Sequence, residues 1–238
     1  MTIVAIHQPN FFPWLGFFDK IVRSDVFILL DHVQFQKTGG GWSNRVKLLI
    51  SGEARWVTAP IMRSFHGVRM INQVAFSPSD PWRDKLLKSL SGSYGRAPFY
   101  RETIELIEQL VRKPENNISL YNAAAIIAIA GHLGIPAQKF QLSSALGVDG
   151  QATEMLIALT RKVGGRAYMC GSGAQGYQQD AAFADAGIGL IYQSFQHPVY
   201  PQIGTGGFVP GLSIIDSLMH VGVNGVRSML QTNLKSAL

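Results

Sequence analysis

The chain of 238 residues contains little charge and almost no cysteine. Its one cysteine, Cys170, has no partner for an internal disulfide, and a zinc site built from cysteines is excluded. A lone thiol is typical of a reducing compartment, so we expect a cytoplasmic protein. Charged residues make up 15% of the chain and hydrophobic residues 47%, a composition that excludes a disordered tail and a coiled coil.

The sequence also has no long hydrophobic run. A helix needs about 20 apolar residues to span a bilayer, whereas the most apolar stretch, residues 123–130, ends at Gly131 and His132. The first residues lack the basic segment of a secretion signal, and no internal repeat or low-complexity tract occurs. We therefore expect one soluble domain over residues 1–238, without a membrane span.

Positive charge is in modest excess and is unevenly distributed. The net charge is +6, and most of it lies in residues 1–118, which hold 15 Lys and Arg against 10 Asp and Glu. No run of five or six like charges occurs, which argues against nucleic acid as a partner. The pattern favours a small anionic ligand such as a nucleotide.

Short apolar runs alternate with stretches of helical periodicity, which predicts an α/β fold. Residues 3–6 predict a buried strand, a helix follows from near Pro13, and residues 26–30 predict a second strand. We expect a mostly parallel, Rossmann-like, three-layer sheet with an irregular β-containing insertion at about residues 33–78. Further strands are predicted at 33–36, 46–50, 56–61, 138–144, 166–170 and 188–195. Helices are predicted from Trp82, after an N-cap within residues 79–82, and at 100–112, 119–133, 153–163 and 213–221.

Polar residues follow the first two predicted strands, where α/β sheets bind ligands. His7, Gln8 and Asn10 come directly after the first strand, and a His and an Asn in this turn are able to hydrogen-bond a phosphate chain. The alternative is a turn that these residues only shape. Asp31 ends the second strand and would hold a substrate amine, orient a histidine or bind Mg²⁺, unless it only caps the strand.

A glycine-rich loop at residues 38–41 lies between Lys37 and the pair Asn44 and Arg45. A guanidinium beside such a loop suits the bidentate recognition of a phosphate or carboxylate. The alternative is the solvated rim of a hairpin. The spacing does not match a Walker motif.

Two later segments also contain candidate site residues. Residues 171–176 have the spacing G-x-G-x-x-G after a predicted strand, but Asp185 comes too early to be the ribose-binding acid of a dinucleotide site, which favours a loop that lines another ligand. His197 lies among prolines and aromatic residues and is a candidate general base or acid. No pair of histidines has metal-ligand spacing, so we expect no metal site.

Several segments of the sequence match one known family. They are 6–18, 25–28, 31–35, Asn44-Arg45, Ser143-Ser144, Tyr168 with Gly171 and Gly173, and 197–202 together with Ser213 and Asp216. Through these segments the sequence resembles the WbqC-like protein family over nearly the full chain. The sequence departs from the family pattern in the 38–41 loop and at residues 145–147, which bear on the identity of the substrate.

The resemblance implies a cytoplasmic enzyme of O-antigen and surface-polysaccharide biosynthesis. Such an enzyme would N-acylate the amino group of a nucleotide-linked aminosugar, by glycyl or another aminoacyl transfer, and ATP with Mg²⁺ would activate the amino acid. A nucleotidyltransferase-like enzyme and a non-catalytic nucleotide-sugar-binding or scaffold protein are the alternatives. The oligomeric state stays open, a homo-oligomer included. The residues expected to act are His7, Asp31 and His197 in catalysis, and Gln8, Asn10, Lys37, Asn44, Arg45, Ser143, Ser144, Gly171, Gly173, Tyr200 and Gln202 in binding.

Overall fold

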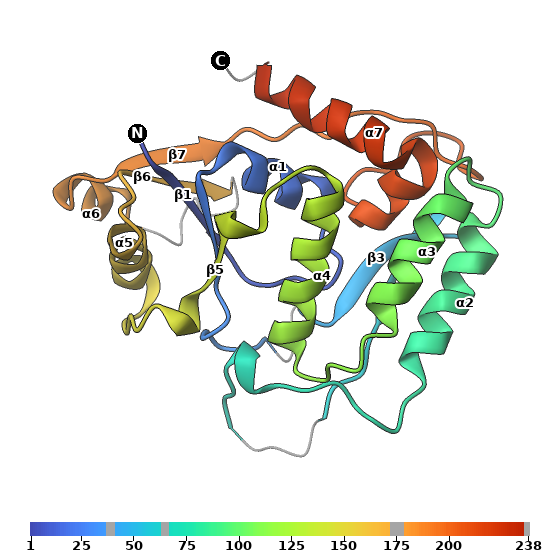
Figure 1. Cartoon of the computed structure of the whole chain (residues 1–238), viewed down its shortest axis with the longest axis horizontal. Coiled ribbons are helices and arrows are strands. Elements are labelled where there is room, and N and C mark those ends of the chain that lie inside the picture. Colours follow the sequence, from blue (N-terminus) through green and yellow to red (C-terminus); the bar gives the residue numbers. More distant parts are fainter. Residues whose placement is uncertain (37–40, 63–66, 172–178, 236–238) are drawn as a thin grey trace.

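The structure is a computed structural model that describes residues 1–36, 41–62, 67–171 and 179–235 (Figure 1). In these residues five strands form one sheet in the order β5-β2-β1-β6-β7, and every neighbouring pair is parallel. Numbered along the chain, this is the 3-2-1-4-5 order of a Rossmann-like sheet. The predicted fold class is therefore confirmed. The strands are β1 Ile3–His7, β2 Val26–Leu29, β5 Phe140–Leu142, β6 Ala167–Gly171 and β7 Gly189–Gln193.

Helices cover both faces of this sheet, as Figure 1 shows. Strand side chains point alternately to the two faces, so Ala5 packs in one hydrophobic cluster and its neighbours Val4 and Ile6 pack in another. The strands thus read as continuous apolar runs because both faces are buried. The first cluster packs against α1 Leu15–Arg23, α4 Ile118–His132 and α7 Ile214–Lys235, and the second against α5 Ala152–Lys162 and α6 Asp180–Asp185.

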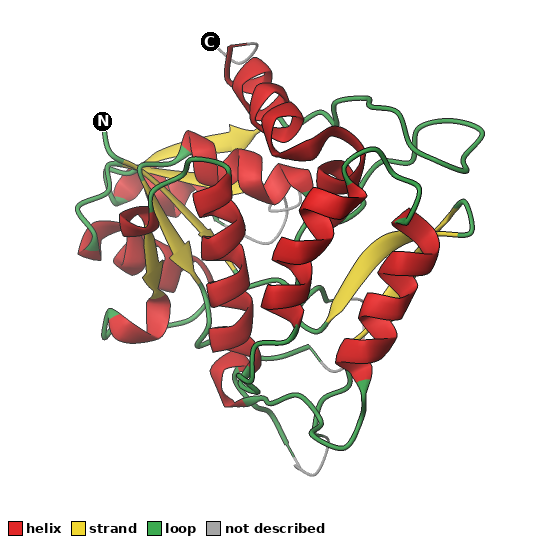
Figure 2. Cartoon of the chain, turned by 45° about the vertical axis from the view of Figure 1, so that its right-hand side comes forward, coloured by secondary structure: helices red, strands yellow, loops and turns green. Residues whose placement is uncertain are grey.

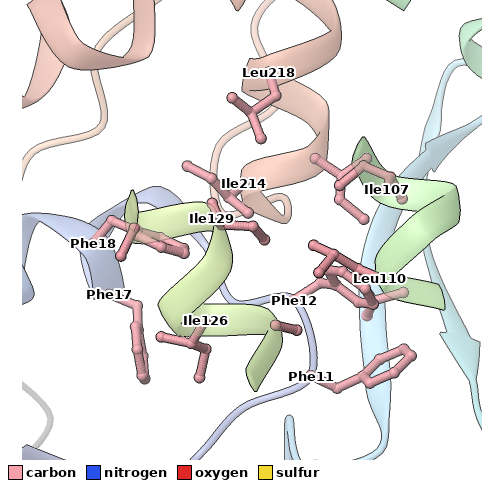
Figure 3. Packing of buried hydrophobic residues seen from close by; sticks show 14 of the residues in the cluster. Phe11, Phe12, Phe17, Phe18, Ile107, Leu110, Ile126, Ile129, Ile214 and Leu218 are labelled. Atoms are coloured by element: carbon pink, nitrogen blue, oxygen red, sulfur yellow. The ribbon is translucent and has the colours of Figure 1, made fainter. Parts of the chain in front are cut away.

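The larger cluster surrounds the segment that follows β1. Figure 3 shows Phe11, Phe12, Phe17 and Phe18 of this segment packed among side chains of other helices. Phe12 is fully buried with φ 45°, a left-handed conformation that is strained for a residue with a side chain. Its carbonyl accepts a 2.7 Å hydrogen bond from the Ser213 hydroxyl at the start of α7. The core therefore holds the chain in one path between β1 and α1.

The chain between β2 and α4 lies beside the five-stranded sheet, with a hairpin of its own (Figure 2), and its apolar side chains share the larger cluster. Its strands β3 Arg45–Ile50 and β4 Glu53–Thr58 pair only with each other, as an antiparallel hairpin. The helices α2 Trp82–Tyr94 and α3 Tyr100–Val111 follow, before α4 returns the chain to the sheet. No described helix combines the length and apolar character needed to cross a membrane.

Three details of the sequence-based prediction are wrong. Residues 33–36 form no strand, because only Gln34 bridges to Met70 and the surrounding backbone bonds to a coil segment. The N-cap of α2 is Pro81, within the expected residues 79–82, but the side-chain cap that these residues predict is not formed. Helix α7 continues past residue 221 through a break at Gly222, whose φ of 67° suits glycine and where a Cβ would lie 2.6 Å from Phe99.

Candidate functional site

A cavity of about 510 Å³ opens where β1 and β6 end. The chain leaves β1 toward β2 and β5 on one side of the sheet and later returns to add β6 and β7 on the other. Ligands of α/β sheets bind at such a switch point, beyond the carboxyl ends of the strands. We name this cavity the switch-point pocket. Its described lining residues are Ile6, His7, Trp14, Gly16, Phe17, Lys20, Tyr168, Gly171, Gln193, Phe195 and His197.

His7 is the last residue of β1, and its ring packs edge-on against Trp14 and Phe17, with ring centroids 5.7 and 4.8 Å away. Its Nδ1 donates to the Gln8 carbonyl at 3.1 Å, which leaves Nε2 as an acceptor. Burial, with the positive charge of Lys20 as a second cause, lowers the pKa of His7 to about 3. The ring is therefore neutral near pH 7, and it is a better hydrogen-bond acceptor than general base.

Lys20 reaches the pocket from the inward face of α1. Only 4% of the residue is exposed, and no described residue forms a hydrogen bond or ion pair with its Nζ. Burial lowers the pKa of Lys20 to about 8, with a small opposing effect of Cys170. A buried ammonium without a partner is unfavourable in a folded protein. Lys20 is thus a buried cation that forms no hydrogen bond or ion pair within the described chain, and Cys170 offsets only part of the cost of its burial.

Gln193 at the end of β7 presents an acceptor to the same pocket. Its Nε2 donates to the Gly16 carbonyl at 2.8 Å and to Asp19 Oδ2 at 2.7 Å. Both amide hydrogens are used in this way, so Oε1 remains free to accept. Asp19 also pairs with Arg23 at 2.8 Å. The charge of Asp19 is therefore balanced within α1 and does not neutralise Lys20.

His197 lies in the loop after β7 and packs edge-on against Phe195, with ring centroids 4.8 Å apart. Burial is the main cause that lowers the pKa of His197, and the positive charge of Lys47 adds to it. The imidazole is thus neutral near pH 7. Unlike His7, it has no ring hydrogen bond to a described backbone group that would commit one nitrogen.

The described pocket lining contains no Asp or Glu. The positive end of α1 faces the pocket, since Gly16 and Phe17 of its first turn line it, and that turn has neither a side-chain cap nor an acidic residue. In the described ranges no three His, Cys, Asp or Glu side chains come close enough to hold a metal ion. The arrangement suits an anionic ligand, and its donors do not fit a Mg²⁺ site.

Asp31 lies apart from the pocket lining, in a cluster of its own. Its Oδ1 accepts from the Ser143 hydroxyl and from Ser144 N–H, both at 2.9 Å, and its Oδ2 accepts from the Ser144 hydroxyl at 2.7 Å. His32 Nδ1 lies 2.6 Å from Ser143 Oγ. Asp31 and Ser143 are buried. These contacts bring three predicted site residues together, and they join the end of β2 to the end of β5.

Tyr200 and Gln202 form a second cluster around a buried carboxylate. Both donate to Asp216 Oδ2, at 2.7 and 2.9 Å, and Tyr94 donates to Oδ1 at 3.0 Å. Burial, followed by the charge of Asp216, raises the pKa values of Tyr94 and Tyr200. This cluster holds the loop that contains His197 against α7, so Tyr200 and Gln202 support the pocket from outside.

Arg45 is also outside the pocket but is linked to it by aromatic rings. Its guanidinium lies 4.2 Å from the centroid of the Trp56 ring, and its Nε donates to the Gly41 carbonyl at 2.9 Å. Trp56 contacts Trp42 with centroids 4.7 Å apart, and Trp42 contacts Trp14 at 5.0 Å. The row of three indoles therefore runs from the pocket wall to the hairpin.

The remaining predicted residues take other positions. Asn44 donates across the hairpin to a backbone carbonyl at 2.9 Å. Gln8 contributes the carbonyl that orients His7, and Asn10 is buried; neither lines the pocket. Lys37 and Gly173 lie outside the described residues.

Sequence reasoning missed Lys20 and Gln193. One signal was present for Lys20: Gly16, Phe17 and Lys20 are spaced so that they share one side of a helix whose apolar stripe includes Phe17. A lysine on the apolar side of a helix that follows a strand is unusual, because lysines are rarely buried unless paired. Gln193 had no comparable signal, since its position depends on how β7 docks.

The structure is thus a parallel α/β sheet with a pocket at its switch point, the place where folds of this class usually bind their ligands. The model of the WbqC-like protein family matches residues 8–228, and the chain belongs to this family. It is 29% identical over 224 residues to the uncharacterized protein Rv1507c of Mycobacterium tuberculosis, covering 93% of this chain and 95% of that protein. No solved structure gives a significant match.

Proposed function

We propose that this protein transfers an acyl group, glycyl or another aminoacyl, to the amino group of a nucleotide-linked aminosugar of surface-polysaccharide or O-antigen biosynthesis. The observation that carries the proposal is the convergence of Lys20, His7, Gln193 and His197 on one pocket. Its volume of about 510 Å³ lies within the range of small-molecule sites. Family membership and the lone thiol support a cytoplasmic reaction on a nucleotide sugar.

The chemistry requires a neutral amine and a base. The sugar nitrogen attacks the acyl carbonyl, a C–N bond forms, the bond to the leaving group breaks, and the nitrogen loses a proton. His197 is the base in this proposal, because its lowered pKa keeps the imidazole neutral and ready to accept that proton. The acceptors His7 Nε2 and Gln193 Oε1 orient the amine through its N–H groups.

ATP with Mg²⁺ remains our proposal for how the amino acid is activated. The described pocket residues offer no carboxylate for the metal, so we assign no step to it. An acyl donor that is activated before it reaches this protein would meet the same pocket. The test below therefore includes both kinds of donor.

The test measures the mass of the sugar nucleotide after incubation with the protein. UDP- and dTDP-linked aminosugars are offered with glycine, ATP and Mg²⁺, or with a glycyl thioester, and we expect a gain of one glycyl group. The same sugars with an acetylated amino group are the matched control and should gain nothing. Release of pyrophosphate from a nucleoside triphosphate without any amino acid would indicate a nucleotidyltransferase instead. No product, with sugar-nucleotide binding intact, would indicate the scaffold protein.

A further inference from the structure

Lys20 lines the switch-point pocket but takes no part in the acyl-transfer step proposed above. We infer that Lys20 and the first turn of α1 bind a phosphoryl group of the ligand. This rests on the proposed function in one respect: in a nucleotide sugar the group would be the pyrophosphate. The inference itself concerns binding and does not depend on acyl transfer.

The first supporting observation is the burial of Lys20. The residue is 4% exposed, lines the pocket, and has no hydrogen-bond or ion-pair partner among the described residues. Buried lysines are almost always paired. The missing counter-charge is therefore expected on the ligand.

The second observation is the start of α1. This helix of nine residues begins at Leu15 without a side-chain cap and without an acidic residue in its first turn. The Phe17 N–H donates to the Trp14 carbonyl at 3.0 Å, so the attraction of this helix end for an anion rests mainly on the positive end of the helix dipole. At Gly16 a Cβ would lie 2.7 Å from Phe195 Cδ1, so a glycine lets the backbone of this turn form the pocket wall. Lys20 follows one turn later on the same side.

The groups that face Lys20 from neighbouring elements leave its charge in place. His7 on β1 is neutral, and burial raises the pKa of Tyr168 on β6, so its phenol is uncharged at pH 7. Cys170 on β6 acts on Lys20 in the opposite sense to burial, because its electrostatic effect raises the pKa of Lys20. Gln193 on β7 is neutral, and the Asp19 carboxylate on α1 is bound to Arg23. An anion that enters the pocket thus meets a single buried cation and the positive end of a helix.

A phosphoryl group fits these donors better than a carboxylate. It offers more acceptor oxygens and more negative charge to the Lys20 ammonium and the positive end of α1, and helix N-termini commonly bind phosphates. The sequence-based prediction gave this role to His7, Asn10 and Arg45. His7 lines the pocket, but its neutral ring has its one N–H bonded to the Gln8 carbonyl. In the structure Arg45 stacks on Trp56, and Asn10 does not line the pocket.

Binding of the ligand should be coupled to the uptake of a proton by Lys20. Burial keeps the pKa of Lys20 at about 8, and a bound phosphoryl group would raise it. Near pH 8 the protein should then take up about half a proton when the ligand binds. The contribution of Lys20, measured as the ratio of the affinities of the unmodified protein and Lys20→Met, should be constant below pH 7 and fall by about tenfold per pH unit well above pH 8.

The experiment is calorimetric titration of the full chain with inorganic pyrophosphate. We expect Lys20→Met to weaken binding about 10- to 100-fold, the range for a lost charge-assisted hydrogen bond. Lys88→Met, at an exposed lysine on α2, is the matched control and should bind like the unmodified protein. Titrations in Tris and in HEPES at pH 8 measure the net proton uptake, which should be smaller by about half a proton in Lys20→Met than in the unmodified protein.

Three results would overturn the inference. The first is that the unmodified protein does not bind pyrophosphate. The second is that a folded Lys20→Met variant binds pyrophosphate as tightly as the unmodified protein does. The third is that acetate binds as tightly as pyrophosphate, with the same dependence on Lys20. Pyrophosphate binding that requires Lys20, without any acyl transfer, would uphold the inference and contradict only the proposed function. Acyl transfer together with pyrophosphate binding that does not depend on Lys20 would uphold the proposed function and contradict the inference.

Discussion

Replacing Lys20 by methionine should stabilise the protein. The pKa of this lysine falls from 10.5 to about 8 on folding, because burial disfavours the charged form. At about 1.4 kcal/mol per pKa unit, the shift corresponds to about 3 kcal/mol of stability lost by keeping the ammonium in the pocket wall. Methionine has nearly the same length and shape without the charge. We therefore expect Lys20→Met to raise the free energy of unfolding by about 3 kcal/mol at pH 7.

The gain should depend on pH in a defined direction. Below about pH 8 the lysine is charged in both the folded and the unfolded protein, so the full penalty is present. Between about pH 8 and 10.5 only the unfolded chain keeps its proton, so the unmodified protein becomes more stable relative to the variant as pH rises. At pH 10 the advantage of Lys20→Met should be below about 1 kcal/mol.

Urea denaturation of both proteins at pH 7 and pH 10 measures this difference. Lys88→Met is the control, since an exposed lysine should change stability by no more than about 0.5 kcal/mol at either pH. A less stable Lys20→Met variant at pH 7, or the same gain at both pH values, would refute the reasoning. Confirmation would mean that the protein sacrifices stability to keep a cation in its pocket, as functional sites commonly do.

Three further predictions concern Asp31, Gly16 and His197. Asp31→Ala should lower the free energy of unfolding, measured by urea denaturation, by about 3 kcal/mol, because Ser143 and Ser144 lose their charged acceptor. Calorimetry should show unchanged pyrophosphate binding by the folded variant; weaker binding would indicate that Asp31 contacts the ligand directly. Gly16→Ala should weaken pyrophosphate binding in calorimetry, since the added methyl group meets Phe195 in the pocket wall; Gly92→Ala, where a Cβ meets no atom, is its control. His197→Gln should slow acyl transfer about 100-fold with little change in pyrophosphate binding. The pKa of His197 is lowered from its usual value of 6.5, so the acid limb of the pH–rate profile of the unmodified enzyme should have its midpoint below pH 6.5; a midpoint above pH 6.5 would contradict this assignment.

Local sequence patterns predicted most elements, because burial and periodicity act over a few residues. The apolar run that forms β1 and the amphipathic pattern that forms α3 appear within one residue of their expected bounds at most ends. Residues 33–36 show where such patterns fail. They have the composition of a strand, yet no neighbouring strand is available, and a single bridge from Gln34 to Met70 remains. Pairing is a property of two segments and cannot be judged from one.

The same distinction applies to the candidate site. His7 and Gly171 were found because each ends a predicted strand, and parallel strands end at a common edge. Asp31 ends a strand as well, but serines from the neighbouring strand end occupy its oxygens. The position at a strand end was therefore correct in all three cases, and the neighbours decided which side chains face the pocket.

By itself, the sequence determined a parallel α/β fold, the strand ends that carry polar residues and the membership of a family. The tertiary structure alone decided that Lys20 of α1 and Gln193 of β7, more than 170 residues apart along the chain, face the same cavity. The physical reason is that strand order and helix docking minimise the exposed apolar surface of the whole chain. The chain has a small excess of positive charge, and one of its cations, Lys20, is buried without an ion-pair partner among the described residues.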